Sequence, residues 1–360
     1  MPPGGRDAPG YDRPVPGVPG APDPETLTAT EFSALFGGRL LPGELDLASG
    51  LPLVVVDLDD APEPNEPLPA PSGLVVGVTT GAPFDRPWAG ADILLAGVPD
   101  PPRPWAGSAS RWLPRIEAAV AANPLAALAA AQLLRLTETL PTSTGLLAES
   151  FAYSMLQAGP EHRDWLARHA AVPPPPEVGP AVLVARDGPR LSVILNRPDR
   201  HNAYGTAMRD GLVEAISVAV SDPTVEEIDL SGAGPSFCSG GDLAEFGTAP
   251  DPATAHAVRV VAGAAPWLDR CAQRLVARVH GACLGAGVEL ASFAGRVVAT
   301  ADARFGLPEV GMGLVPGAGG TVSVPRRIGR QRAALLAVTG VTVDAATALG
   351  WGLVDQLLSA

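Results

Sequence analysis

The chain has 360 residues, of which 46% are hydrophobic, and its 38 acidic and 25 basic residues give a formal net charge of −13. Nucleic acids and anionic membranes bind basic surfaces, so an acidic chain of this kind is expected to bind neither. All 25 basic residues are arginine, which excludes mechanisms that need a Schiff-base lysine or a P-loop lysine.

The three cysteines, Cys238, Cys271 and Cys283, show no metal-binding spacing, and an odd number fits a reducing compartment. No basic segment followed by an apolar one opens the chain, so no signal peptide is predicted. The longest apolar stretch, 118–134, is interrupted by Asn123 and Pro124, which makes it too short for a membrane span. We therefore expect a cytoplasmic protein without a metal site.

Residues 1–25 are rich in Pro, Gly and Asp, a composition that predicts disorder. A folded N-terminal region is predicted from 26 to 171. It opens with apolar runs of strand length and continues with helices, the first of which has Asn123 as its N-cap and Pro124 at its first position. The runs are 53–58, 74–78 and 93–98, and the helices are 124–136, 146–157 and 162–170. This order predicts a smaller α/β or mainly helical domain.

Four consecutive prolines, at positions 173 to 176, cannot continue a helix or a central strand. They predict a stiff linker over 172–177. From 178 to 360, strands and helices alternate, which predicts an α/β fold. The predicted strands are 181–186, 191–195, 225–231, 276–279 and 297–299, and the helices are 202–220, one that begins at 289, 331–339 and 345–350.

Three glycine-rich segments carry the chemistry of this second region. They read FCSGGDL at 237–243, HGACLGAGVEL at 280–290, and FGLPEV at 305–310 followed by LVPGAGGT at 314–321. A glycine turn that leads into a helix exposes backbone N–H groups, which suit a developing negative charge. Two such donors would form an oxyanion hole.

Glu289 and Glu309 follow these turns and could act together as a general acid and base. Each has an ordinary explanation as well. Glu289 could simply favour a helix N-terminus, where the dipole stabilises acidic side chains, and Glu309 could be a solvated turn residue. The pair is the more informative signal.

With these segments in this order, and with LNRPDRHNA at 195–203 before them, residues 182–357 resemble the crotonase superfamily, the enoyl-CoA hydratase/isomerase family. The resemblance implies a spiral of ββα units. It also implies an acyl-CoA thioester substrate, no metal, and no cofactor apart from the coenzyme A of the substrate. A homo-oligomer, either a trimer or a hexamer, is expected on the same ground.

The resemblance places the oxyanion-hole N–H groups on Gly241 and Ala286. It places coenzyme A contacts on Ser239, Gly240, Asp242 and Leu243, and Arg197 and Arg200 are either phosphate ligands or surface charges. Glu289 and Glu309 match both glutamates of the hydratases. That match implies a lyase that adds water across the C2=C3 bond of a 2-enoyl-CoA.

Three alternatives stay open. An isomerase would shift a double bond chiefly through Glu309, and a specialised biosynthetic member would act on another acyl- or aryl-CoA. A scaffold homologue would bind a partner through its N-terminal region and catalyse nothing, although retention of both glutamates speaks against it.

The chain departs from the family pattern at both ends. Family members continue with further helices after the stretch that resembles 351–356, whereas this chain ends at Ala360 and carries about 150 residues ahead of the core. The segment 123–135 resembles a helix of that C-terminal region. We therefore hypothesise that 26–171 is a degenerate crotonase-like half, without catalytic residues of its own, whose helices cover the core near Glu289.

Overall fold

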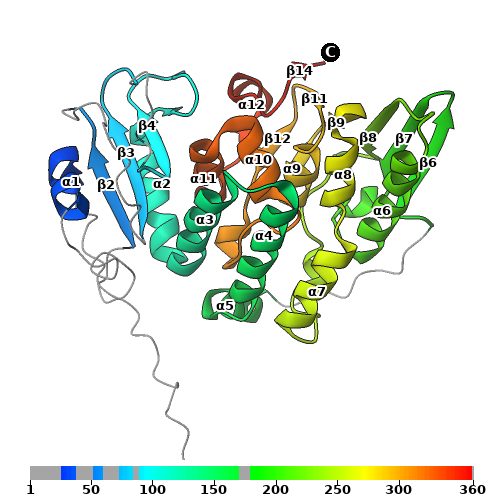
Figure 1. Ribbon diagram of the computed structural model, residues 1–360, viewed down its shortest axis with the longest axis horizontal. Helices are drawn as coiled ribbons and strands as arrows, with labels where there is room; N and C mark the ends of the chain where they lie inside the picture. The colour runs from blue at the N-terminus through cyan, green and yellow to red at the C-terminus, as the bar shows by residue number, and fades with distance from the viewer. Residues whose placement is uncertain are drawn as a thin grey trace, which may run out of the picture.

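The computed structural model describes residues 26–37, 52–59, 73–83, 88, 90–169 and 179–358. The segment 1–25 and the linker 172–177, for which disorder and stiffness are predicted, lie outside these residues. A parallel sheet lies at one end of the molecule and a larger sheet at the other, with a layer of helices between them (Figure 1). The α/β class predicted from the sequence is confirmed.

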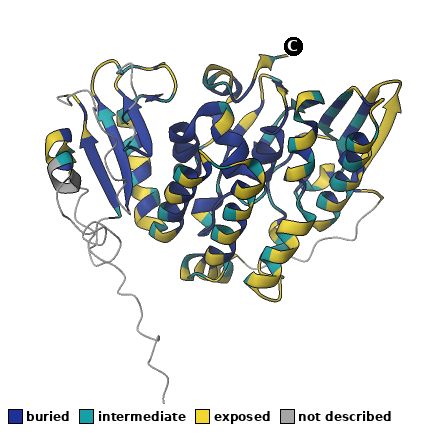
Figure 2. Cartoon of the chain, viewed as in Figure 1, coloured by how far each residue is buried: buried dark blue, intermediate teal, exposed yellow. Residues whose placement is uncertain are grey.

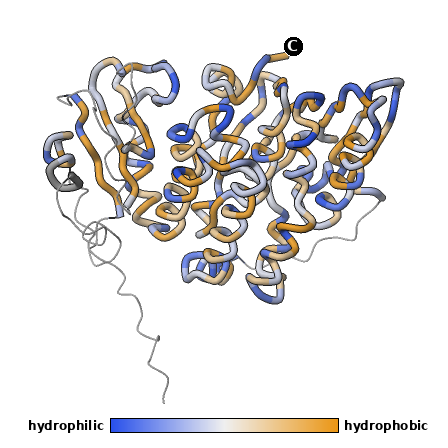
Figure 3. Tube along the Cα trace, viewed as in Figure 1, coloured by the Kyte–Doolittle hydropathy of each residue, from blue (hydrophilic) through white to orange (hydrophobic). Residues whose placement is uncertain are grey.

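The N-terminal sheet has five parallel strands in sequence order. Its central strands are apolar on both faces because both faces are covered, as the hydropathy of β2, β3 and β4 shows in Figure 3. One face packs against α1 (Ala29–Gly37) and two tryptophans, and the other packs against helices that follow in the chain. The strands are β1 (Thr26–Thr28), β2 (Leu53–Asp57), β3 (Leu74–Thr79), β4 (Ile93–Ala96) and β5 (Ala106–Gly107).

Four helices follow this sheet: α2 (Ala109–Ala122), α3 (Pro124–Thr137), α4 (Thr142–Gln157) and α5 (Pro160–Arg168). The last three were predicted, although α4 begins four residues earlier than expected, directly after Pro141. In the described part of the chain no single helix is long and apolar enough to cross a membrane. α2 and α3 pass such a test only as a pair, and they meet at a bend of 113°.

The C-terminal half contains a six-stranded sheet in the order β14-β11-β9-β8-β7-β6, parallel except for the β6–β7 hairpin. A small second sheet has the order β10-β12-β13. The strands are β6 (Val182–Asp187), β7 (Arg190–Leu195), β8 (Glu227–Gly232), β9 (Leu275–Val279), β10 (Ala282–Leu284), β11 (Arg296–Ala299), β12 (Arg304–Gly306), β13 (Val343–Asp344) and β14 (Gln356–Leu357).

Strands and helices alternate through this half, as the crotonase fold requires. The α-helices are α6 (Thr206–Ser221), α7 (Pro252–Ala262), α8 (Ala265–Cys271), α9 (Ala286–Ala291), α10 (Gly320–Ile328), α11 (Arg330–Thr339) and α12 (Ala345–Trp351). Four short 3₁₀ turns join them: η2 (Pro198–Arg200), η3 (Leu243–Glu245), η4 (Ala272–Arg274) and η5 (Glu309–Met312). The sequence prediction did not include α7, α8 or α10.

One hydrophobic core runs through both halves of the chain. It joins β3 and β4 to α2, α3 and the almost fully buried α11, and this buried band is visible across the centre of Figure 2. The division into a domain at 26–171 and a catalytic core at 178–360 stays a prediction. In the folded chain these two parts share one hydrophobic core.

Polar contacts also join the halves. Asp92 is fully buried, and its carboxylate accepts hydrogen bonds from Arg135 of α3 and Arg330 of α11. Arg135 Nε lies 2.6 Å and Arg330 Nη1 lies 3.2 Å from Asp92 Oδ1. Arg332 donates to the carbonyl oxygens of Trp105 and Pro101 at 2.8 and 2.9 Å. Burial lowers the pKa of Arg332 to about 10, but its guanidinium stays charged at neutral pH.

Candidate active site

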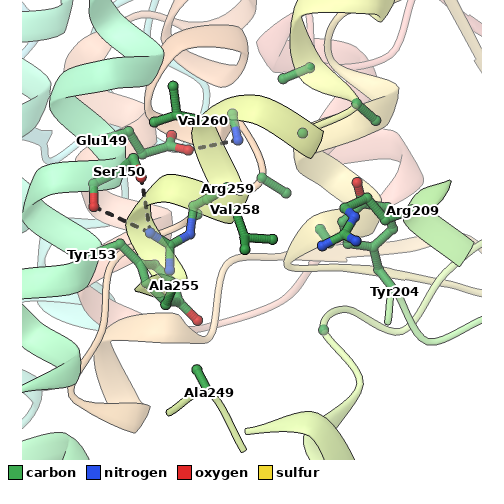
Figure 4. A pocket seen from close by; sticks show the side chains of 18 of the residues that line it. Glu149, Ser150, Tyr153, Tyr204, Arg209, Ala249, Ala255, Val258, Arg259 and Val260 are labelled. Carbon is green, nitrogen blue, oxygen red and sulfur yellow. Dashed lines mark hydrogen bonds between the residues drawn. The ribbon is translucent and has the colours of Figure 1, made fainter. Parts of the chain in front are cut away.

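A pocket of about 590 Å³ lies where α4, α7, α9 and the turn before α10 meet. Both glutamates singled out in the sequence line it, together with Gly241 and Ala286. The structure thus brings the three glycine-rich segments to one place. Side chains from the N-terminal half, Glu149 and Tyr153 of α4, line the same space (Figure 4).

Glu289 lies in the first turn of α9. The helix begins three residues before the predicted start because Gly285 turns the chain, with φ of 48°, a value that favours glycine. Glu289 is 2% exposed, and its Oε2 accepts hydrogen bonds from the N–H groups of Ala318 (2.7 Å) and Gly320 (2.8 Å). The carboxyl therefore rests on the turn that opens α10.

Glu309 opens η5, directly after Pro308. Its side chain is buried, so it is not the solvated turn residue that was one of the two explanations from sequence. The carboxyl packs against Gly285: a Cβ added to this glycine would lie 2.4 Å from Glu309 Oε1. Among the described residues, its Oε2 has no hydrogen-bond partner, which leaves that oxygen available to a ligand or water.

Two backbone N–H groups complete the arrangement. Gly241 follows Gly240, whose φ is 105°, and Ala286 is the first residue of α9. Both residues line the pocket, and neither N–H donates to another described residue. Two free donors beside two buried carboxyls have the composition of an oxyanion site with an acid/base pair.

The predicted coenzyme A residues are distributed unevenly. Asp242 lines the pocket, but its buried carboxylate is held by Arg200 (2.7 Å) and Arg197 (3.1 Å). These two arginines therefore form internal ion pairs, and Arg197 is not a surface charge because it is buried. Ser239, Gly240 and Leu243 are not among the residues that line the pocket. The assignment of all four to coenzyme A stays a prediction.

Glu149 was not predicted from sequence. It is 2% exposed and accepts hydrogen bonds from the N–H groups of Gly319 (2.8 Å) and Thr321 (2.9 Å) and from the Thr321 hydroxyl (2.7 Å). Arg259 of α7 lies with its guanidinium 4.2 Å from the ring centre of Tyr153 (Figure 4). A single glutamate in an otherwise ordinary helix carries no motif, so nothing in the sequence distinguished it.

Glu149, Glu289 and Glu309 are buried carboxyls without an arginine ion pair, and they cannot all lose their protons easily. Burial raises the pKa of Glu149 to about 7 and that of Glu309 to about 8, and the charge of Glu149 adds to the second shift. Burial also raises the pKa of Glu289 well above its usual value, with Glu309 and Glu149 as further causes. Each of these carboxyls therefore keeps its proton to a higher pH than a free glutamate does, and neighbouring carboxyls that titrate together can exchange the roles of acid and base.

Other residues of chemical interest have structural surroundings. Cys238 and Cys283 are buried, and burial raises the pKa of each thiol, that of Cys238 to about 12, which makes them poor nucleophiles. Within the described ranges no group of three or more His, Cys, Asp or Glu side chains is arranged to hold a metal ion.

Comparison with known proteins identifies the family. The family described as Enoyl-CoA hydratase/isomerase matches residues 191–360. The 2,3-dehydroadipyl-CoA hydratase of Escherichia coli K12 is 35% identical over 176 residues, which are 49% of this chain and 68% of that protein. The mevalonyl-coenzyme A hydratase SIDH of Beauveria bassiana is 36% identical over 179 residues, 47% of this chain and 63% of its own.

Solved structures that resemble the chain include enoyl-CoA hydratases from Thermoplasma volcanium and Mycobacterium smegmatis. The Thermoplasma volcanium enzyme is 32% identical with a TM-score of 0.45, and the match covers 51% of this chain and 73% of that one. The Mycobacterium smegmatis enzyme is 33% identical with a TM-score of 0.46, and the match covers 50% of this chain and 71% of that one. The family match at 191–360 includes the three glycine-rich segments and both glutamates, and it does not include the N-terminal sheet. The chain belongs to the enoyl-CoA hydratase/isomerase family, and its C-terminal half has the crotonase fold.

Proposed function

We propose that the protein is an enoyl-CoA hydratase-type lyase that adds water to the C2=C3 bond of a 2-enoyl-CoA thioester. The observation that carries the proposal is the meeting of two buried carboxyls, Glu289 and Glu309, with the unpaired N–H groups of Gly241 and Ala286 in one pocket. Family membership supplies the substrate class, a coenzyme A thioester.

One carboxylate of the pair takes a proton from water as the water oxygen bonds to C3. The electrons of the double bond move toward the thioester oxygen, where the Gly241 and Ala286 N–H groups stabilise the enolate. The second carboxyl, which is protonated, then delivers its proton to C2. Losing one such backbone donor typically slows catalysis by about 10²–10³-fold.

The test is hydration of crotonyl-CoA and of longer, aryl and carboxyl-bearing enoyl-CoAs, followed by loss of the conjugated thioester absorbance. The carboxyl-bearing compound belongs in the set because Arg209 and Arg259 line the pocket. Loss of absorbance with at least one of these thioesters supports the proposal. If the purified protein leaves every one of them unchanged, it is not a hydratase of this kind.

An isomerase is the second candidate, since the family includes both activities and Glu309 has the oxygen without a partner. A 3-enoyl-CoA substrate separates the two, because isomerisation creates the conjugated absorbance that hydration removes. The homo-oligomer, whether trimer or hexamer, and the cytoplasmic location stay predictions.

A further inference from the structure

The turn that opens α10 binds two carboxylates from different elements through alternate backbone N–H groups. Ala318 and Gly320 donate to Glu289, whereas Gly319 and Thr321 donate to Glu149. Successive N–H groups of this turn thus point to opposite carboxyls. A shift of the turn that loosened Glu149 would also move the donors of Glu289.

Glu149 is held firmly in this arrangement. Arg259 donates to Ser150 Oγ (3.0 Å), Ser154 Oγ (3.1 Å) and Gln157 Oε1 (3.0 Å), which ties α7 to the face of α4 beside Glu149. The Thr137 hydroxyl of α3 donates to the Thr321 carbonyl at 2.8 Å. Two helices of the N-terminal half, α3 and α4, are therefore hydrogen-bonded to the α10 turn.

We propose that Glu149 is a positioning residue for the Glu289–Glu309 pair: it fixes the α10 turn whose N–H groups hold Glu289, and it places a third carboxyl beside the pair. The inference rests on the proposed function, because it assigns Glu149 a part in that same site. It also gives the N-terminal half a role in catalysis that no glycine motif indicated.

The charges around Glu149 support this role. Arg259 faces it from α7 and favours its ionised form. Four other acidic residues line the pocket: Glu289 and Glu309, Asp242, which is paired with Arg197 and Arg200, and Glu245, which accepts hydrogen bonds from Thr206. Several titratable groups on the other elements packed against α4 are engaged away from Glu149: Arg135 of α3, Glu138 directly after it, His162 of α5 and Asp269 of α8. Two more contact α4 at other residues, since Arg326 of α10 donates to Thr142 and His256 of α7 hydrogen-bonds with Ser150. Arg270 of α8 lies over the ring of Trp267. The charge of Glu149 raises the pKa of both catalytic candidates.

A matched control lies elsewhere in the same half. Glu161 accepts hydrogen bonds from the N–H groups of Leu125 (2.7 Å) and Ala126 (2.9 Å) at the start of α3, but it does not line the pocket. Glu161→Gln therefore removes the same kind of helix-capping charge. A purely structural role for Glu149 predicts that the two variants behave alike.

The experiment compares Glu149→Gln with Glu161→Gln and the wild type. In Glu149→Gln the amide NH₂ meets a backbone N–H donor, so the turn should shift. We expect kcat to fall about 10- to 100-fold, since a misplacement of about 1 Å can cost 10²-fold, with KM changed by less than about threefold. Thr321→Val, which removes only the hydroxyl donor, should show a smaller loss in the same direction and guards against misfolding of the first variant.

A second measurement does not depend on activity. With ¹³C at the glutamate δ-carbons, NMR follows the titration of Glu309, assigned by its absence in Glu309→Gln. Removal of the Glu149 charge should lower that titration midpoint by about half to one unit, while Glu161→Gln should leave it in place. If the wild type hydrates no enoyl-CoA, the proposed function fails and this titration alone decides the role of Glu149. An unchanged midpoint, or an unchanged kcat in an active enzyme, overturns the inference.

Discussion

The two halves of the molecule contribute to the pocket in different ways. The C-terminal half supplies Glu289, Glu309 and the glycine turns, all of which belong to recognisable motifs. The N-terminal half supplies Glu149 and Tyr153 from a helix without any motif. The difference arises because a tight turn beside a reacting group restricts residue type, whereas a helix face tolerates many residues as long as one side is apolar.

The comparison also shows how a chain can be recognisable over half its length and still form one core. The family match covers residues 191–360, yet β3, β4, α2 and α3, which lie before it, share one hydrophobic core with α11. One half is thus catalytic and the other supporting.

Substitution of the catalytic candidates should have the largest effect. Glu289→Gln and Glu309→Gln should each lower kcat for hydration by about 10²–10⁴-fold, the usual contribution of a general acid or base. Glu289→Gln could spare isomerisation of a 3-enoyl-CoA, whereas Glu309→Gln should stop both reactions. Steady-state rates with the two thioester types measure this, and full activity in both variants would show that the site lies elsewhere.

Loss of the Asp92 carboxylate should destabilise the whole chain. Asp92→Asn leaves the guanidinium groups of Arg135 and Arg330 without their buried anion, and breaking such a buried pair costs about 3–5 kcal/mol. Urea denaturation followed by fluorescence measures the free energy of unfolding. As a control, Glu227→Gln removes an exposed partner of Arg190 and should cost less than about 1 kcal/mol. Separate transitions for the two halves would contradict the shared core.

Stability should fall as the pH rises from about 5 to about 8. Folded-state pKa values of about 7 for Glu149 and about 8 for Glu309 lie above the ordinary value of 4.5. The folded state therefore binds more protons than the unfolded state in this window, and the free energy of unfolding decreases with pH. Urea denaturation at pH 5.5, 6.5, 7.5 and 8 measures the slope, which Glu309→Gln should flatten. A flat dependence would mean that the carboxyls are ionised in the folded state throughout this window.

A methyl group at Gly320 should disturb the site at moderate cost. A Cβ there would lie 2.6 Å from Glu289 Cγ, so Gly320→Ala must displace that side chain, at about 1–3 kcal/mol, and should lower kcat. Gly350→Ala in α12 is the matched control, since a Cβ there meets nothing within 4 Å and helical alanine is favoured over glycine by about 1 kcal/mol. Thermal unfolding and hydration rates measure both. Equal behaviour of the two variants would contradict the close packing of Glu289 on α10.

Local patterns predicted much of the fold. The apolar runs at 53–58, 74–78 and 93–98 form strands β2, β3 and β4, and the Asn123–Pro124 signal marks the start of α3. The glycine-rich segment 314–321 gave no helix prediction, yet α10 begins within it at Gly320. This helix start depends on carboxylates from α4 and α9 that accept its first N–H groups, and such distant partners leave no local signal.

The sequence by itself determined the family, the glycine turns and the glutamate pair, because tight backbone conformations and buried carboxyls limit which residues can occupy those positions. The tertiary structure alone decided that a helix from the N-terminal half closes the pocket and that Glu149 lies beside Glu289 and Glu309. The distance along the chain between Glu149 and Glu289 is bridged only when the shared core forms. The surroundings and the raised pKa of each carboxyl follow from that packing and from the water it excludes.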